Sequence, residues 1–231
     1  MIRLKRIFFP VVLMVVIAGA FSVSLSYAEE KLTVYTVNYP LAYMAKRIGQ
    51  DRVEVVFPAP ADLDPAYWVP ETDIVIDYQE ADLILINGAN YAKWLSKVSL
   101  PKSRFIDTTK QVRDRFIPLD DSLTHNHGPG GEHSHEGYAF TVWLDLDIAS
   151  HQAERIAAGF SKKIPRQHEL FQQNLEQFQS EMKRFDAQLH TLGSKYGTIP
   201  IIGSHPVYQY FSRRYGFNIK SVHWEPDQHP S

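Results

Sequence analysis

The chain has 231 residues, of which 44% are hydrophobic and 22% charged, enough apolar material for the core of one or two domains. Its formal charge of −2 disfavours nucleic acid as a partner. It contains no cysteine, which excludes disulfides, thiolate metal ligands and a lipid anchor on cysteine. Any metal must therefore be bound by His, Asp, Glu or water.

Residues 1–28 have the pattern of a secretory signal peptide. Three basic residues precede an apolar run from Ile7 to about Leu25, and Ser26-Tyr27-Ala28 ends in a small residue. The alternative is an uncleaved anchor, because the run approaches the roughly 18–20 residues that a membrane span requires. Pro10 and the small residues favour cleavage after Ala28 and a periplasmic location. Cleavage would leave 21 of the 24 Lys and Arg against all 26 Asp and Glu, a formal charge of −5 that weakly favours a cation-binding protein.

Residues 29–119 are predicted to form an N-terminal α/β lobe. Apolar, β-forming segments predict strands at 32–37, 53–57, 83–86 and 105–107. Helical spacing predicts helices at 40–47, 74–81 and 89–97, the first ending at a Gly49 C-cap. Strands that alternate with helices indicate βαβ units on a parallel sheet.

Residues 138–197 are predicted to complete this lobe and to form long linking helices. One helix spans 147–162, and a longer one starts at Pro165, where proline is tolerated. Apolar residues in the longer helix form one stripe with alternating steps of four and three, which predicts a buried face; a coiled-coil seam is the alternative. The stripe comprises Phe171, Leu175, Phe178, Met182, Phe185, Leu189 and Leu192.

Residues 198–231 are predicted to form part of a second α/β lobe. A strand at 199–203, a helix at 206–215 and a strand at 218–223 make one βαβ unit. One such unit gives only a two-stranded parallel sheet, and parallel sheets require cover on both faces. We therefore expect an incomplete lobe in a truncated chain.

Residues 120–137 form a histidine-rich loop, in which two His-x-His pairs flank Gly-Pro-Gly-Gly. Four neutral imidazoles on one loop can surround a zinc, copper or nickel ion. The glycines and the proline argue against helix or strand. A solvated polar loop without a specific ligand is the alternative. The four histidines are His125, His127, His133 and His135.

From Leu32 to its last residue the chain resembles the periplasmic solute-binding proteins of zinc and manganese ABC importers. The resemblance implies two α/β lobes joined by a long rigid helix, with the metal in the cleft between them. It also implies a monomer that delivers the ion to a membrane permease and its ATPase. The motifs that carry the resemblance include Tyr39-Pro40-Leu41, Asp51-Arg52-Val53, Ala81-Asp82-Leu83, Asn87-Gly88-Ala89, Val142-Trp143-Leu144-Asp145, Ser204-His205-Pro206-Val207-Tyr208 and Arg213-Arg214-Tyr215-Gly216.

The resemblance also implies four metal ligands, of which only one matches. The family's first histidine follows an Asp-Pro pair; here Asp64-Pro65 is followed by Ala66. The second lies two residues before the Trp-Leu-Asp motif, where this chain has Thr141. The third matches His205, and the fourth, an acid, lies beyond the last residue. One histidine cannot hold Zn²⁺ tightly, because the ion takes about four donors.

The site has therefore either been rebuilt or been lost, and other donors are available for a rebuilt site. A loop histidine is close enough in sequence to Thr141 to enter the cleft, and the last strand carries His223 and Glu225 to the rim where His205 lies. Alternatives remain: His223 as a surface residue, His205 as a helix cap, and Asp64 as a turn former rather than, with Tyr67, an oxygen donor. The candidate metal ligands are His205, His125, His127, His133, His135, His223 and Glu225.

The function expected from these features is capture of Zn²⁺, or less favourably Mn²⁺, for an ABC importer. Nitrogen and oxygen donors without thiolates fit zinc. The alternative is a His-rich periplasmic zinc buffer or chaperone with an inactive cleft. The sequence has neither a His-Glu-x-x-His motif nor a Gly-x-Ser-x-Gly nucleophile elbow, so we do not expect an enzyme.

Overall fold

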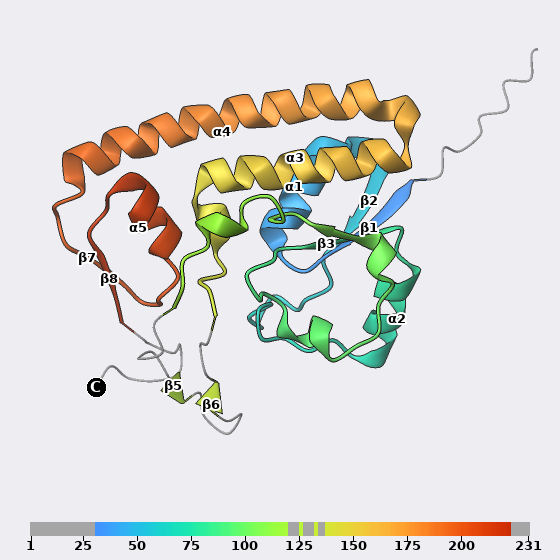
Figure 1. Cartoon of the computed structure of the whole chain (residues 1–231), viewed down its shortest axis with the longest axis horizontal. Coiled ribbons are helices and arrows are strands. Elements are labelled where there is room, and N and C mark those ends of the chain that lie inside the picture. Colours follow the sequence, from blue (N-terminus) through green and yellow to red (C-terminus); the bar gives the residue numbers. More distant parts are fainter. Residues whose placement is uncertain (1–30, 120–124, 127–131, 134–136, 223–231) are drawn as a thin grey trace, which may run out of the picture.

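A computed structural model of the chain describes residues 31–119, 125–126, 132–133 and 137–222 (Figure 1). The predicted signal peptide lies outside the described residues. The main elements are β1 (Leu32–Thr36), α1 (Tyr39–Gly49), β2 (Val53–Val56), α2 (Thr72–Glu80), β3 (Leu83–Ile86), β4 (Phe105–Asp107), β5 (His125–Asn126), β6 (Glu132–His133), α3 (Leu146–Lys163), α4 (His168–Tyr196), β7 (Ile201–Gly203), α5 (Gln209–Tyr215) and β8 (Ile219–Ser221).

The first lobe contains the predicted parallel sheet. Its strand order is β2-β1-β3-β4, and all three pairings are parallel. The central strand β3 is the most apolar: it has the sequence Leu-Ile-Leu-Ile, with its first three residues buried. An uninterrupted apolar strand is what a sheet covered on both faces requires, so the prediction of an α/β lobe is confirmed.

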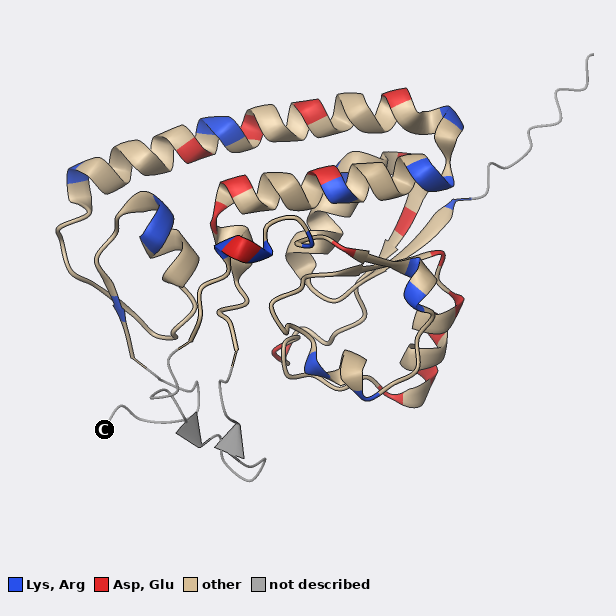
Figure 2. Cartoon of the chain, in the orientation of Figure 1, with Lys and Arg blue, Asp and Glu red and all other residues tan. Residues whose placement is uncertain are grey.

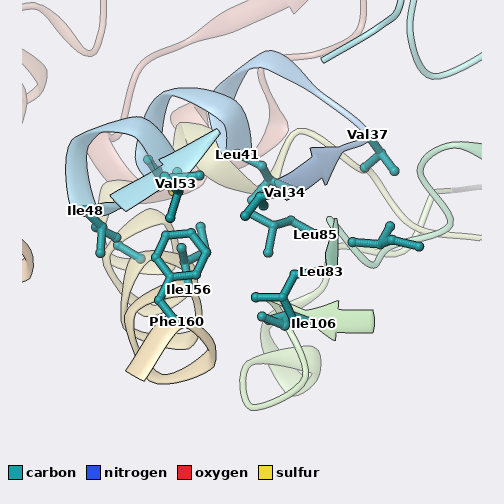
Figure 3. Close-up of a cluster of buried hydrophobic side chains, with 14 of the residues drawn as sticks. Val34, Val37, Leu41, Ile48, Val53, Leu83, Leu85, Ile106, Ile156 and Phe160 are labelled. Atoms are coloured by element: carbon teal, nitrogen blue, oxygen red, sulfur yellow. The ribbon is translucent and has the colours of Figure 1, made fainter. Parts of the chain in front are cut away.

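Helices cover both faces of this sheet. In the core shown in Figure 3, Val34 of β1 and Leu85 of β3 lie among side chains of α1 and α3, including Ile156 and Phe160. On the other face Tyr78 of α2 packs edge-on against Tyr35, and its hydroxyl donates to the Thr36 carbonyl at 2.9 Å. Burial of these side chains supplies most of the free energy that holds the lobe together.

Helix α1 differs from the prediction at its end. Asn38 caps its first turn by accepting a hydrogen bond from the Leu41 amide at 3.0 Å. The predicted Gly49 C-cap is wrong, since Gly49 is helical and Gln50 takes the positive φ of 48°. Gly49 is needed for another reason: a Cβ there would overlap the side chain of Val53 where the chain enters β2.

The predicted helix at 89–97 is also wrong. Ala89, Asn90 and Ala92 all have positive φ, between 47° and 56°, which breaks any right-handed helix. Only a short 3-10 helix follows, at Lys93–Ser96. Helical spacing of apolar residues therefore misled the prediction where the backbone is left-handed.

The linking helices are present, but only half of the predicted apolar stripe is buried. Helix α4 has 29 residues and packs along α3 (Figure 1). Phe171 and Phe178 are buried, Phe178 with 1% of its surface exposed, whereas Phe185 is 54% exposed. The prediction of a fully buried face is therefore wrong at Phe185 and at Leu192, which is 45% exposed. No helix within the described ranges is both long and apolar enough to cross a membrane.

The second lobe has the predicted two-stranded parallel sheet, with Ile201 beside Ile219. Helix α5 connects the strands and ends at Gly216, whose φ of 76° suits glycine. Ile202 is 70% exposed, so one face of the sheet is bare. Both strands are shorter than predicted.

The histidine-rich loop contains two short strands that the sequence did not predict. β5 and β6 pair antiparallel, with His125 opposite His133. The expectation of no strand was therefore wrong at the flanks of the Gly-Pro-Gly-Gly segment, since a turn of this composition also brings two extended segments together.

The two halves of the stripe predict different costs for the same substitution. Phe178→Ala removes a buried ring and is expected to lower the free energy of unfolding by about 3–5 kcal/mol. Phe185→Ala, the matched control on the same helix, is expected to cost less than about 1 kcal/mol because its ring is already half in water. Urea unfolding of the two variants measures both values, and equal losses would contradict the observed burial.

Candidate metal site

His205 lies where parallel sheets commonly hold ligands. It follows the carboxyl end of β7 on the turn that leads into α5, and its ring is half-buried. Its Nδ1 atom is 3.3 Å from the Ser204 hydroxyl, and its carbonyl accepts a hydrogen bond from the Val207 amide at 2.9 Å. The N-cap of α5 is Tyr208, so the alternative that His205 caps this helix is wrong.

Thr141, which stands at the family's second ligand position, faces the same turn. Its side chain donates a hydrogen bond to the Val207 carbonyl at 2.6 Å. Only 7% of the residue is exposed. Thr141 belongs to the segment that completes the first lobe and Val207 to the second lobe, so this bond joins the two lobes directly beside His205.

Ala66, at the family's first ligand position, lies in a tight turn built by Asp64. An Asp64 side-chain oxygen accepts from the Ala66 amide at 2.9 Å, and the Asp64 carbonyl accepts from the amides of Tyr67 and Trp68 at 3.1 and 2.9 Å. The alternative that Asp64 forms a turn is therefore confirmed. Ala66 itself is buried in the core of the first lobe.

Aromatic rings connect this turn to the segment that carries Thr141. The Tyr67 and Phe140 ring centroids are 6.4 Å apart, and those of Tyr91 and Phe140 are 5.2 Å apart. Burial, together with the negative charge of Asp64, raises the pKa of Tyr91, which keeps its phenol neutral. Thr141 thus lies beside the turn that carries His205, and the residue next to Ala66 contacts the residue next to Thr141; of these three positions only His205 carries an imidazole.

A buried polar network, which the sequence analysis missed, supports the segment that carries Phe140 and Thr141. The Asn87 side-chain amide donates to the Phe140 carbonyl at 2.9 Å. The Asn87 side-chain oxygen accepts from the amides of Gln152 and Asn38 at 3.2 and 3.3 Å. Polar residues that follow parallel strands, as Asn38 and Asn87 do, are the one signal from which this network was foreseeable.

Of the other predicted ligands, only His125 and His133 belong to the described part of the chain. The backbone of the β5–β6 pair places His125 opposite His133. His127, His135, His223 and Glu225 lie outside the described residues. Among the side chains of residues 31–119 and 137–222, no three from His, Asp or Glu form a group that could hold a metal ion.

Ion pairs fasten the helix that follows His205 to the linking helix. The Arg214 guanidinium meets the Asp186 carboxylate at 2.6 and 2.8 Å, and the Tyr215 hydroxyl donates to the same carboxylate at 2.9 Å. The hydrogen bonds from Arg214 lower the pKa of Asp186, and they outweigh its partial burial, which acts in the opposite direction.

Comparison with known proteins identifies this architecture. Residues 34–231 match the model of the ZnuA family, described as zinc-uptake complex component A, periplasmic. The chain belongs to the ZnuA family. The match spans both lobes and the linking helices, and so extends far beyond the histidine-rich loop.

Curated relatives of this ZnuA-family chain are metal-binding components of transporters. The manganese ABC transporter substrate-binding lipoprotein PsaA of Streptococcus mitis is 26% identical over 211 residues, which cover 85% of this chain and 63% of PsaA. The zinc-binding lipoprotein AdcA of Streptococcus pneumoniae is 24% identical over 208 residues, which cover 88% of this chain and 41% of AdcA. The chain therefore spans less than two thirds of the length of these relatives.

Solved structures establish the fold. The metal-dependent lipoprotein YcdH of Bacillus subtilis superposes with a TM-score of 0.71 at 22% identity, over 87% of this chain and 71% of YcdH. The periplasmic zinc-binding protein TroA of Treponema pallidum superposes with a TM-score of 0.65 at 23% identity, over 83% of this chain and 66% of TroA. The predicted fold class, α/β with parallel sheets and a long helix, is confirmed.

The Thr141 hydroxyl predicts a difference between two conservative substitutions. Thr141→Val keeps the shape but leaves the Val207 carbonyl without its donor, so we expect a loss of about 1–2 kcal/mol in the free energy of unfolding. Thr141→Ser keeps the donor and is expected to retain most of that stability. Chemical denaturation of both variants measures the difference, and a serine variant as unstable as the valine variant would contradict the role of the hydrogen bond.

The pairing of Asp186 predicts a specific pH dependence. The pKa of Asp186 is lower in the folded than in the unfolded chain, so the ionised carboxylate stabilises the fold. This contribution to the free energy of unfolding is complete above the unfolded pKa of about 3.9 and is lost as the pH falls through the folded pKa. Asp186→Asn should therefore be less stable than the wild type at pH 7, with a gap that narrows below about pH 4. Unfolding titrations at several pH values measure the gap; a gap independent of pH would contradict this assignment.

Proposed function

We propose that this chain is the metal-binding component of an ABC importer, which captures Zn²⁺, with Mn²⁺ as the alternative, and passes it to a membrane permease and its ATPase. The observation that carries the proposal is the ZnuA-family match over residues 34–231. The names of PsaA and AdcA, which refer to manganese and zinc respectively, support the choice of ions. A zinc buffer that uses only the loop is less favoured, because the similarity extends over both lobes.

The proposed site is centred on His205, with further donors from the histidine-rich loop or from His223 and Glu225. Ala66 and Thr141 offer no imidazole, so the chain must complete the coordination of zinc differently from the family pattern. Its half-buried place between the lobes gives His205 a partly dehydrated environment, which strengthens coordination of a cation.

The proposed location is the periplasm, reached through the signal peptide at residues 1–28. The family description and the lipoprotein names of the relatives support an extracytoplasmic location. We propose transport without catalysis, since the family is one of transporter components.

Metal binding by the full chain tests this proposal. Zinc-stripped protein, dialysed against Zn²⁺ and assayed by elemental analysis, is expected to retain one tightly bound ion. His205→Ala should weaken that site by at least about tenfold, because a direct ligand matters no less than the partners that orient ligands. His168→Ala, at an exposed histidine on α4, is the matched control and should leave binding unchanged.

Two outcomes would contradict the proposal. Wild-type protein that returns from dialysis without bound metal would overturn the function. An unchanged tight site in His205→Ala would remove His205 from the ligand set. Deletion of residues 124–136 then distinguishes a site at His205 from a site on the histidine-rich loop. One remaining tight site supports binding at His205, whereas complete loss of binding supports a zinc buffer that uses only the loop.

A further inference from the structure

We propose that Asp145 and Arg214 are positioning residues that fix the place of His205 between the lobes before any metal arrives. The inference rests on the proposed function only in assigning His205 to a metal. The positioning itself is a property of the protein alone, so it can be tested separately.

Asp145 is the meeting point of several parts of the chain. It caps α3 by accepting hydrogen bonds from the amides of Asp147 and Ile148 at 3.1 and 3.3 Å. The same carboxylate lies 3.1 Å from the Arg115 guanidinium of the first lobe and 3.2 Å from that of Arg214 on α5. Only 3% of Asp145 is exposed. A buried carboxylate with partners from three segments fixes those segments relative to one another.

Arg214 extends the connection to α4. Its guanidinium contacts Asp145 through Nη1, which leaves Nε and Nη2 for the two oxygens of Asp186. In Figure 2, α5 carries a blue segment, and α4 and the start of α3 carry red segments. One planar guanidinium therefore joins α5 to both linking helices, a geometry that lysine cannot reproduce.

Further contacts make α5 a fixed support for the turn that carries His205. Tyr210 is fully buried in an apolar cluster with residues of the first lobe, and its hydroxyl accepts from the Ile117 amide at 3.2 Å. At Gly193 of α4 a side chain would overlap the Tyr215 carbonyl, so the two helices are in close backbone contact. The turn with His205 runs directly into α5, and the Thr141 bond holds its other side.

A matched ion pair elsewhere separates positioning from simple stabilisation. Arg47 of α1 binds Glu181 of α4 through two bonds of 2.8 and 2.9 Å. Like the pair of Arg214 and Asp186, it is partly exposed and joins a helix to α4. It does not touch the second lobe, so its loss should affect stability without moving His205.

The experiment compares Arg214→Gln with Arg47→Gln in the full-length protein. Hydrogen exchange followed by mass spectrometry reports the opening of residues 204–215 without metal. Absorption spectra with Co²⁺ report the coordination geometry. We expect exchange of this segment to rise about tenfold and Co²⁺ affinity to fall about 10- to 100-fold in Arg214→Gln, with an altered visible spectrum. Arg47→Gln should match the wild type in the exchange of residues 204–215, in Co²⁺ affinity and in the visible spectrum. Asp145→Asn should resemble Arg214→Gln.

The results distinguish this inference from the proposed function. If exchange of residues 204–215 is the same in Arg214→Gln as in Arg47→Gln, the positioning role is wrong, whatever the metal data show. If exchange rises in Arg214→Gln alone but wild-type protein binds no Co²⁺ or Zn²⁺, the proposed function is wrong, whereas the positioning of the turn by Asp145 and Arg214 is supported. If exchange rises but the Co²⁺ spectrum and affinity are unchanged, the pair does not position His205 as a ligand, and the inference is overturned.

Discussion

The buried carboxylate of Asp145 is the interaction on which the arrangement of the two lobes depends. A charge with so little contact with water is tolerated only when it is fully paired, and its partners come from the first lobe, from the start of α3 and from α5. This explains how a second lobe of two short strands and one helix keeps a defined place although Ile202 is largely exposed. The second lobe is held by what it contacts in the first lobe more than by a core of its own.

The same contacts define the candidate site. The sequence resembles a family pattern with three histidines on different segments, and in this chain two of those segments meet where Thr141 donates a hydrogen bond to the Val207 carbonyl, two residues after His205. At two of the three positions this chain has a residue that cannot bind a metal as histidine does. Ala66 packs in the core of the first lobe, and Thr141 forms a hydrogen bond that joins the lobes. A metal that binds at His205 would therefore meet two lobes that protein contacts already connect.

Local features of the fold could be predicted from the sequence. The strands at 83–86 and 105–107 and the single βαβ unit of the second lobe were predicted correctly, because uninterrupted apolar runs are distinctive. The segment at 89–97 could not be predicted, since three left-handed residues depend on the tertiary environment rather than on spacing. The stripe on α4 has the same pattern along its length, and only the structure shows that Phe185 and Leu192 are exposed.

The site was less predictable, and the reason is the sequence separation of its contacts. His205 was identified by its place in a motif, but its supports are pairs such as Asn87 with Gln152 and Asp145 with Arg214, more than 60 residues apart. No periodic pattern reports such a pair. A polar residue after a strand shows only that a partner is needed, and folding determines which one it finds.

The distance between the lobes tests this account most directly. The chain has no cysteine, so spin labels on Lys110→Cys and Lys220→Cys would attach one to each lobe, at exposed positions, without competing thiols. Pulsed electron paramagnetic resonance should give a single narrow distribution of the distance between the two labels. This distribution should be the same with and without Zn²⁺, because protein contacts already fix the lobes relative to each other. A broad distribution without metal, or a distance that shifts when Zn²⁺ is added, would contradict the account.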